Sequence, residues 1–370
     1  MKSDVSVYNI SMMNERLFIL YVIKKDFSNI SDGVWGDILI EIILLFVWSF
    51  AISLILLYLH IRMAHKIGWL SPDAHKKEET YVVDRGGVIL FLIPVIALPV
   101  ILIDSEYMHV YMALSACVIL GALTGFIDDF KDMGLKKAII VIVAALPIIL
   151  LGVYYPRPYI PFIGRTRMTL VYPLFIMVLF SVMADACNMI DIYNGILVLQ
   201  GLAILVPLLI IGIVGGYKLC TYLVLVGIGY TVAFLIWNKY PARVFHGNVG
   251  AYGYGSMLAA IIVLSGLEAV GIEFISIIGF LPAVFNGFIY VFNTRFAPRS
   301  RVAQKKKSNF FKDGYLVPNI DPDAAVDLSR LFLLHGKMTE KDLINAYMVM
   351  FIISGVLSLA TGLLILHGII

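Results

Sequence analysis

Two adjacent carboxylates, Asp128 and Asp129, stand in the sequence GFIDDFKDMG, directly after the uncharged stretch 110–127. A charged acid near the bilayer centre costs about 3 kcal/mol or more, so an acidic pair here needs a polar or cationic environment. Lysines follow closely, at positions 131, 136 and 137. Carboxylates hold Mg²⁺ or accept protons and lysines neutralise phosphate oxygens, so the cluster indicates metal-assisted phosphate chemistry. The alternative is a hydrated helix end at the membrane surface.

A second polar cluster, DACNMIDIYNG, occupies residues 185–195. Asp185, Asn188 and Asp191 are spaced three apart, so neighbours in this series share one face of a helix. Asn194 is followed by glycine, a pair that signals a turn or a break. Amide and carboxylate oxygens are the hard ligands that Mg²⁺ prefers. The alternative is a polar helix end that the Asn-Gly pair caps.

A glycine-rich segment, WNKYPARVFHGNVGAYGYG, occupies residues 237–255. Pro241 predicts the end of a helix, and a glycine-rich turn that leads into a helix can offer N–H groups to a phosphate. Small residues also allow close packing of membrane helices. Close packing is the favoured interpretation for Gly253 and Gly255.

The segment APRSRVAQKKK places two arginines beside three lysines. Arg299 and Arg301 could form a fork that binds a pyrophosphate, because guanidinium groups pair with phosphate in a bidentate manner. The lysines at 305–307 favour a contact with anionic headgroups.

The elements that must position these residues are membrane-spanning helices. The chain has 370 residues, of which 61% are hydrophobic and 14% charged, with a mean hydropathy of +0.93. Apolar runs of about 20 residues match the thickness of a bilayer, and in lipid such runs must be helical. The sequence therefore predicts an all-α polytopic membrane protein with about ten transmembrane helices, at 38–59, 87–103, 109–127, 138–154, 168–184, 196–214, 219–237, 249–267, 274–292 and 344–368.

The regions outside these spans give little other information. Residues 1–36 form a predicted extracytoplasmic tail without an evident cleavable signal peptide, and residues 37–370 form the transmembrane domain. The three cysteines lie in or beside apolar runs, and they have neither metal-binding spacing nor the pattern of a disulfide framework.

The distribution of basic residues predicts the orientation. The loops 60–86, 128–137, 185–195, 238–248 and 293–343 together hold 20 Lys and Arg, and the loops on the opposite side hold 4. Loops rich in Lys and Arg stay in the cytoplasm, so the first set is predicted to form a cytoplasmic active-site face. All the polar clusters described above fall on that face. Transporters more often keep their polar groups near mid-membrane.

The ordered motifs D…HK…RGG, GFIDDFKD, N-x-x-D-x-x-N-G, N-x-x-P-A-R-V-F-x-G and P-R-x-R resemble those of the polyprenyl-phosphate N-acetylhexosamine-1-phosphate transferases, which are glycosyltransferases of family 4. The resemblance covers roughly residues 40 to 368. Members of this superfamily have ten spans and cytoplasmic active-site loops. The arginine segment looks more like that of the dolichyl-phosphate branch, with an archaeal or other prokaryotic source, than like that of the more distant phospho-MurNAc-pentapeptide translocase.

The resemblance implies roles for individual residues. Catalytic roles fall on Asp128, Asp129, Lys137 and Asp191, where the first acid is a candidate base and Lys136 is an alternative to Lys137. Substrate-binding roles fall on Lys76, Arg85, Asp185, Asn194, Arg299 and Arg301. Metal-binding roles fall on Asn188 and Asn248.

Two positions depart from the pattern. Asn248 stands where the family usually has an aspartate that binds magnesium, and Ser300 replaces the central histidine of an Arg-His-Arg segment. Asn248 keeps a carbonyl oxygen but lacks the charge. The site should then hold Mg²⁺ less tightly, or rely more on the diphosphate oxygens of the substrate and on Asp128, Asp129 or Asp191.

The resemblance also implies the reaction. A GlcNAc-1-phosphate, or a related N-acetylhexosamine-1-phosphate, passes from a UDP-sugar to a polyprenyl or dolichyl phosphate, and UMP leaves, as in the first membrane step of protein N-glycosylation. Mg²⁺ is the implied cofactor, and Mn²⁺ could replace it. The implied partners are the two substrates and membrane lipids, without nucleic acid, and the chain could form a homodimer. The alternatives are a weak or inactive relative that binds lipid phosphate, and a proton-coupled transporter.

Overall fold

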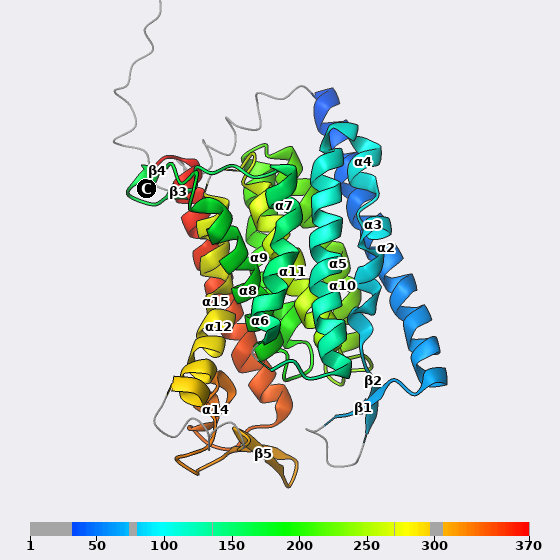
Figure 1. The fold of residues 1–370 in the computed structure, drawn as a ribbon, viewed down its shortest axis with the longest axis vertical. Helices are drawn as coiled ribbons and strands as arrows, with labels where there is room; N and C mark the ends of the chain where they lie inside the picture. Colours follow the sequence, from blue (N-terminus) through cyan, green and yellow to red (C-terminus); the bar gives the residue numbers. More distant parts are fainter. Residues whose placement is uncertain (1–31, 74–79, 135, 270, 297–305, 370) are drawn as a thin grey trace, which may run out of the picture. The chain divides into compact units, whose positions relative to one another are not determined.

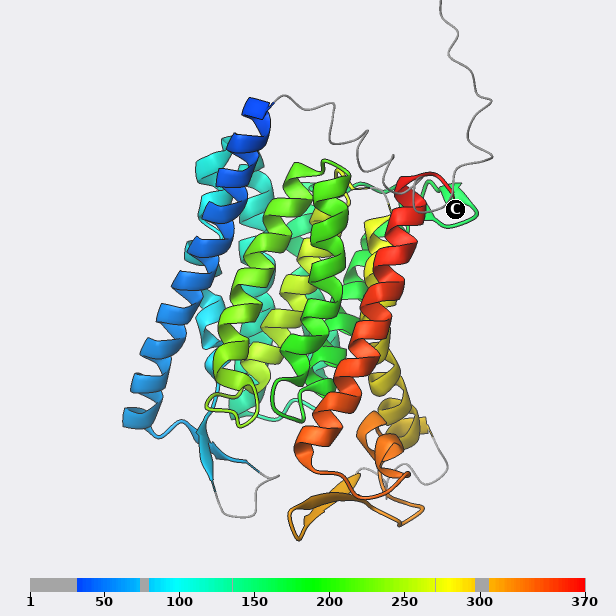
Figure 2. The ribbon, with the colours of Figure 1, turned by 180° about the vertical axis from the view of Figure 1, so that it is seen from behind.

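The computed structural model describes residues 32–73, 80–134, 136–269, 271–296 and 306–369. Residues 1–43 form one unit and residues 44–370 a second, and the arrangement below is that of the second unit. Its long helices run side by side, as two opposite views show (Figures 1 and 2). Within the described part of the chain, nine helical segments are long and apolar enough to cross a membrane. The prediction of a helical, polytopic membrane protein is therefore confirmed.

The long helices are α2 (Asp32–Ile67), α5 (Met108–Phe130), α8 (Tyr172–Ile190), α9 (Ile196–Val214), α10 (Lys218–Asn238), α11 (Gly247–Ser265), α12 (Ile272–Val291) and α15 (Glu340–Leu366). The second span is built from shorter pieces, η1 (Gly86–Leu92), α3 (Ile93–Ile96) and α4 (Pro99–Ile103), and the turn η2 (Ser105–Tyr107) precedes α5. A π-helical turn, η4 (Phe292–Phe296), extends α12, and α14 (Leu328–Leu333) precedes α15.

The predicted span at 138–154 differs from the others. It consists of α6 (Lys136–Ile140), η3 (Val141–Ala145) and α7 (Leu146–Leu151), and Gly152 ends it in a left-handed conformation. At the usual rise of each helix type, these pieces extend about 26 Å, slightly less than the hydrocarbon thickness. The stretch is therefore helical as predicted, but it is shorter than predicted and is not one continuous α-helix.

In the described part of the chain, three short antiparallel hairpins connect the helices, and the sequence did not suggest them. They are β1 (Leu70–Pro72) with β2 (Tyr81–Val83), β3 (Tyr159–Ile160) with β4 (Gly164–Arg165), and β5 (Asn309–Lys312) with β6 (Tyr315–Pro318). The β1–β2 and β5–β6 hairpins lie at one end of the bundle, where α5 ends, and β3–β4 lies at the other end (Figure 1). We call the first end the site end and the second the β3–β4 end.

Close packing of α11 against α5 and η1 depends on glycine. A Cβ atom at Gly125 would lie 2.0 Å from the carbonyl oxygen of Asn248, and one at Gly87 would lie 1.9 Å from Cα of Gly250. Gly255 likewise faces Ala184, 2.6 Å from where its Cβ would be. Backbones can approach this closely only without a side chain, so the packing interpretation is confirmed at Gly255, and a Cβ at Gly253 would likewise lie 2.8 Å from the side chain of Leu90.

Replacing Gly125 by alanine should therefore destabilise the protein, because the backbone of α11 must move to accept the methyl group. We expect a loss of about 1–3 kcal/mol, the usual cost of overpacking, seen as a lower unfolding temperature in detergent. Gly287 in α12 is a matched control, since the nearest atom to its Cβ position is the sulfur of Met189 at 3.4 Å. Equal unfolding temperatures for the two alanine variants would show that the contact at Gly125 is not tight.

Candidate functional site

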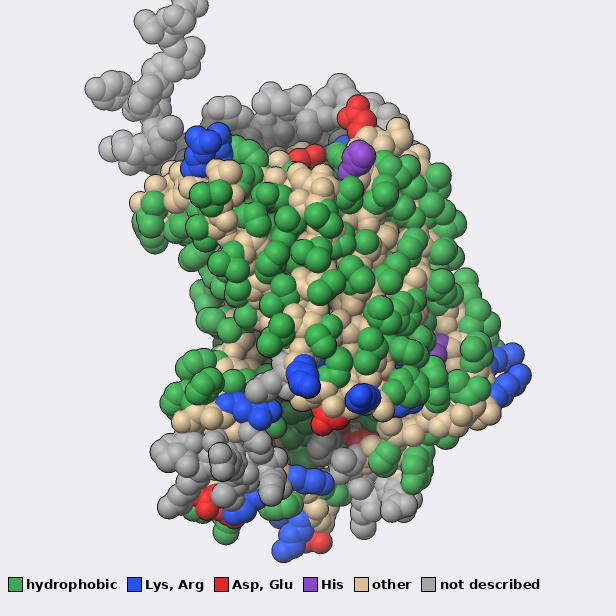
Figure 3. Space-filling view, in the orientation of Figure 1, with side chains coloured by type: hydrophobic (Ala, Val, Ile, Leu, Met, Phe, Trp, Pro, Cys, Tyr) green, Lys and Arg blue, Asp and Glu red, His purple; other side chains and the backbone are tan. Residues whose placement is uncertain are grey.

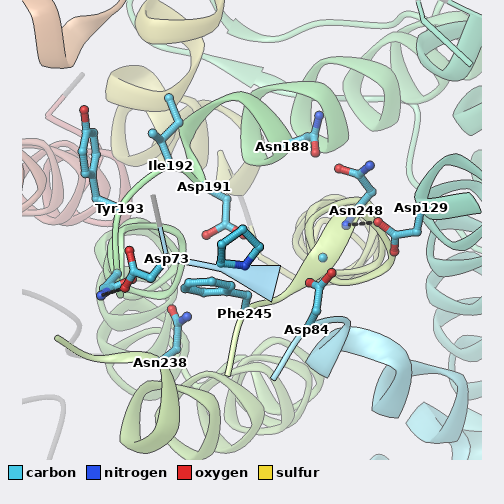
Figure 4. A pocket seen from close by; sticks show the side chains of 13 residues that line it. Asp73, Asp84, Asp129, Asn188, Asp191, Ile192, Tyr193, Asn238, Phe245 and Asn248 are labelled. Atoms are coloured by element: carbon cyan, nitrogen blue, oxygen red, sulfur yellow. Dashed lines mark hydrogen bonds between the residues drawn. The ribbon is translucent and has the colours of Figure 1, made fainter. Parts of the chain in front are cut away.

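A polar cavity of about 460 Å³ opens at the site end, where the loops after α5 and α8 meet the start of α11. Its walls come from segments far apart in the sequence, and Figure 4 shows most of their side chains. The lining residues are Pro72, Asp73, Asp84, Asp129, Asn188, Asp191, Ile192, Tyr193, Asn194, Asn238, Phe245, Gly247 and Asn248. Seven of the sequence-predicted positions are thus at or beside one cavity: five line it, Asp128 binds Asn248 in its wall, and Arg85 binds Asp129 there.

Asp128 is buried at the end of α5 and is surrounded by donors. One carboxylate oxygen accepts hydrogen bonds from Nζ of Lys137 at 2.8 Å and from the side-chain amide of Asn248 at 2.9 Å. The other oxygen accepts the backbone N–H of Met133 at 2.8 Å. Lys136 is exposed, so the structure brings Lys137, and not Lys136, to the acidic pair. Burial of a carboxylate and a lysine costs desolvation energy, so an ion pair at the end of an apolar span indicates a functional position.

Asp129 binds the first turn of α11. Its two carboxylate oxygens accept the backbone N–H groups of Asn248 at 2.9 Å and Val249 at 3.0 Å. This contact satisfies two donors that a helix start leaves without partners, and it places a negative charge at the positive end of the helix. Gly247, with φ of +66°, makes the turn that leads into α11. Because both N–H groups donate to Asp129, they do not donate to a phosphate in this arrangement.

Arg85 contacts Asp129 from the other side. Its guanidinium donates to the backbone carbonyl of Asp129 at 3.3 Å and approaches the carboxylate at 3.9 Å. The guanidinium also lies over the rings of Trp69 and Phe130, at 5.3 and 4.8 Å from their centres. The two rings and the carboxylate together fix the orientation of the guanidinium. These contacts place Arg85 beside the cavity and against Asp129.

Asp185 lies away from the cavity lining. Its carboxylate accepts a short hydrogen bond from the hydroxyl of Tyr252, and Nζ of Lys137 lies 5.7 Å from the centre of the Tyr252 ring. The three side chains connect α8 and α11 to the acidic pair on α5. This arrangement supports a role of Asp185 in holding Tyr252 and Lys137.

The second polar cluster contributes one wall of the cavity. Asn188 and Asp191 come from the last turn of α8, and Asn194 follows in the turn before α9. The turn is held because the N–H of Gly195 donates to Asn238 Oδ1 at 3.0 Å, and the side chain of Asn194 donates to Asp73 at 3.4 Å. Figure 4 draws Asn188, Asp191 and Asn248 among the side chains that line the cavity.

Several cavity residues were missed by the sequence reasoning. Asp73 and Asp84 lie around the β1–β2 hairpin, in the motif that contains Arg85, and Asn238 and Phe245 lie in the N-x-x-P-A-R-V-F motif. The motifs themselves were recognised, but nothing in their spacing showed which members face a cavity. Tyr193, buried on the same wall, has its pKa raised to about 12 by burial, so its hydroxyl keeps its proton at neutral pH.

His246 is a further missed residue. The ring is fully buried and stacks on Phe234, with centroids 3.7 Å apart. Its Nδ1 lies 3.4 Å from a carboxylate oxygen of Asp191, and neither ring nitrogen has a hydrogen-bond partner among the described residues. The ring thus stands behind Asp191 and limits where that carboxylate can lie.

The donor set of the cavity suits a hard cation. Asp84, Asp129 and Asp191 supply carboxylates, and Asn188 and Asn248 supply amide oxygens. Within the described residues there is no group of three or more Asp, Glu, His or Cys arranged to hold a metal. An ion here would need amide, water or substrate oxygens as well, which fits Mg²⁺ because that ion usually keeps several waters and binds substrate phosphates.

Three predicted substrate-binding residues, Lys76, Arg299 and Arg301, lie outside the described residues. The same is true of Ser300 and of the tail predicted at 1–36 up to residue 31.

Comparisons with known proteins identify the family of the chain. The model of the family named glycosyl transferase family 4 matches residues 111–266, which include the acidic pair, the second polar cluster and the start of α11. A protein of Saccharolobus solfataricus, named as a UDP-N-acetylglucosamine–dolichyl-phosphate N-acetylglucosaminephosphotransferase, is 31% identical over 228 residues, 60% of this chain and 71% of that relative.

Two further relatives are more distant. A Sulfolobus acidocaldarius protein with the same name is 28% identical over 271 residues, 70% of this chain and 80% of its own. A Bacillus subtilis protein, named as an undecaprenyl-phosphate N-acetylglucosaminyl 1-phosphate transferase, is 26% identical over 273 residues, 72% of this chain and 74% of its own. By its helices and its similarity to these proteins, the chain is a multi-pass integral membrane transferase that belongs to glycosyl transferase family 4.

Proposed function

We propose that the protein transfers N-acetylglucosamine 1-phosphate from UDP-N-acetylglucosamine to a polyprenyl phosphate of the dolichol type, and that UMP is released. The observation that carries the proposal is the position of Asp128, buried at the end of a span with Lys137 and Asn248 bound to it, beside a polar cavity. A lipid phosphate in the bilayer and a nucleotide sugar from water can meet only near such an end. The archaeal relatives support the choice of sugar and lipid.

In the proposed reaction, an oxygen of the lipid phosphate attacks the β-phosphorus of the nucleotide sugar. The bond from that phosphorus to the bridging oxygen breaks, UMP leaves, and a polyprenyl diphosphate sugar forms. Asp128 takes the proton from a lipid phosphate that arrives protonated, and Lys137 holds that carboxylate in place and offers positive charge to the phosphate. There is little covalent work for the protein, so positioning and charge stabilisation account for the rate.

The cavity residues share the remaining tasks. Asp129 and Arg85 fix the start of α11 and so the position of Asn248. Asn188 and Asn248, with Asp191 as the nearby carboxylate, are the proposed magnesium ligands. When bound, Mg²⁺ would neutralise diphosphate oxygens in a cavity that otherwise carries several carboxylates. Mn²⁺ offers the same chemistry.

The orientation is also part of the proposal. The loops at the site end hold most of the Lys and Arg outside the N-terminal tail, so we assign this end to the cytoplasm, where nucleotide sugars are available. The first membrane step of N-glycan assembly is the process that this reaction fits.

The test is the lipid product formed by purified protein from radiolabelled UDP-N-acetylglucosamine, dolichyl phosphate and Mg²⁺. We expect a chelator-sensitive, acid-labile lipid product and release of UMP. Undecaprenyl phosphate and UDP-N-acetylgalactosamine in parallel reactions test the choice of lipid and sugar. Asn248 supports a second candidate, a relative that binds lipid phosphate without turnover, and this candidate is favoured if lipid phosphate binds but no product forms with any of these substrates.

Substitution of Arg299 or Arg301 by alanine should weaken binding of UDP-N-acetylglucosamine more than binding of lipid phosphate. Each charged hydrogen bond to a diphosphate contributes about 1.5–3 kcal/mol, so we expect an affinity loss of about 10- to 100-fold in titration calorimetry. Lys312→Ala, an exposed lysine of β5 in the same loop, is the control. Unchanged nucleotide affinity in both arginine variants would assign this segment to headgroup binding instead.

A further inference from the structure

The β3–β4 hairpin carries an exposed apolar tip at the β3–β4 end of the bundle. Tyr159 pairs with Arg165 and Ile160 with Gly164, and the turn between them presents Phe162 and Ile163. These two side chains are 87% and 72% exposed. We call them the apolar tip. Two large apolar side chains at the end of a hairpin are costly in water but suit the boundary between headgroups and acyl chains.

The tip continues a surface that faces lipid along α8. Leu170 precedes the helix with 91% of its surface exposed, and Leu174, Val178 and Val182 follow on α8 with exposed side chains. A spacing of four residues places the last three on one helix face. The apolar tip therefore lies where this lipid-facing surface ends.

Three arginines surround the tip, at positions 157, 165 and 167, and we call them the arginine trio. All three are exposed, and the segment 155–171 has no acidic residue. Figure 3 shows Lys and Arg side chains together with hydrophobic ones over the region where Figure 1 draws β3 and β4. Among the described residues of the other loops at this end, Lys218 is basic, and it pairs with Asp104 at 3.5 Å. Most Lys and Arg of the loops lie in the set at the site end, so a basic loop at the opposite end departs from that distribution.

Among the described residues, no carboxylate pairs with the arginine trio. Arg157 and Arg165 line a cavity of about 290 Å³ together with Glu268 and Glu273, but among the described residues no arginine of the trio forms an ion pair. Both glutamates have other donors: Glu268 accepts from Tyr107 and from the backbone of Leu219, and Glu273 accepts from Tyr172 at 2.6 Å. The nearest polar partner of Arg167 is the hydroxyl of Thr169, at 3.3 Å.

We propose that the β3–β4 hairpin is an interfacial anchor that binds anionic lipid headgroups at the end of the bundle opposite the candidate site. The apolar tip enters the outer part of the acyl region, and the arginine trio binds headgroup phosphates above it. Guanidinium groups suit this task because they pair with phosphate through two hydrogen bonds, and each basic residue near an anionic surface contributes attraction. The proposal does not depend on the reaction at the other end.

The test uses a fluorophore at the tip. The native cysteines at 117, 187 and 220 are buried, so Ile163→Cys can be labelled selectively with an environment-sensitive dye. The labelled protein is placed, one copy per nanodisc, in phosphatidylcholine with or without phosphatidylglycerol. We expect a blue-shifted emission that headgroup-region spin labels quench, and stronger quenching with phosphatidylglycerol. Ser105→Cys, an exposed position at the same end, is the control that should remain in water.

A variant without the charges separates the two parts of the anchor. Replacing the arginine trio by glutamine should abolish the increase that phosphatidylglycerol causes and leave the quenching in phosphatidylcholine. Arg167→Gln alone should reduce the increase in quenching that phosphatidylglycerol causes. This single variant replaces the triple variant in the test if the triple variant unfolds.

Three results would overturn the proposal. The first is a tip dye that stays in water in both lipids, and the second is quenching that does not change with phosphatidylglycerol. The third is a blue shift that is absent with one copy per nanodisc and appears only with two copies, since the tip would then contact a second protein copy.

Discussion

Asp128→Asn should lower transfer by about 100- to 1000-fold while the protein still folds, because the substitution removes the charge that binds Lys137 and accepts the proton but keeps the shape of the side chain. In the structure this carboxylate accepts three hydrogen bonds, and asparagine cannot accept all of them from donors on both sides. The measurement is formation of the radiolabelled lipid product, alongside the unfolding temperature in detergent.

Asp132→Asn is the matched control for this result. Asp132 lies four residues further on, is exposed, and bonds only the N–H of Gly134 among the contacts in the structure, so its neutralisation should leave transfer nearly unchanged. If Asp128→Asn retains activity close to that of the unmodified protein, the acidic pair does not take part in the chemistry as proposed.

Asn248→Asp should lower the Mg²⁺ concentration needed for half-maximal activity by about tenfold, equivalent to roughly 1.4 kcal/mol of tighter binding. The side-chain amide of Asn248 now donates to Asp128 at 2.9 Å, whereas aspartate would place two carboxylates in contact. Their repulsion at this distance amounts to several kcal/mol at an effective dielectric constant of about 20, and a divalent cation bound by residue 248 would relieve it.

The same geometry gives a readout that does not require activity. Without Mg²⁺ the Asn248→Asp variant should unfold at a lower temperature than the unmodified protein, and added Mg²⁺ should raise its unfolding temperature more. Asn248→Ala, which has neither the donor nor the charge, should show no such gain. An identical Mg²⁺ dependence for asparagine and aspartate would mean that residue 248 does not bind the ion.

The amino-acid sequence by itself determined the class of the protein and most of its helices. Long apolar runs such as 196–214 and 219–237 predict α9 and α10 almost to the residue, because a bilayer leaves the backbone no alternative to a helix. The run 138–154 is also helical as predicted, but it is divided into three helical pieces, and the last of them has Pro147 in its first turn. The motifs also identified Asp129, Asn188 and Asp191, which line one cavity in the structure.

Only the tertiary structure decided how the polar residues are connected. Lys137 was chosen over Lys136 by the turn after α5, which points one lysine to Asp128 and the other to the surface. Asp129 became the cap of α11 because Gly125 lets two helices approach to backbone contact, a distance that no local pattern encodes. Sequence spacing describes one helix at a time, whereas a site at the ends of several helices depends on how their side chains pack between segments a hundred residues apart.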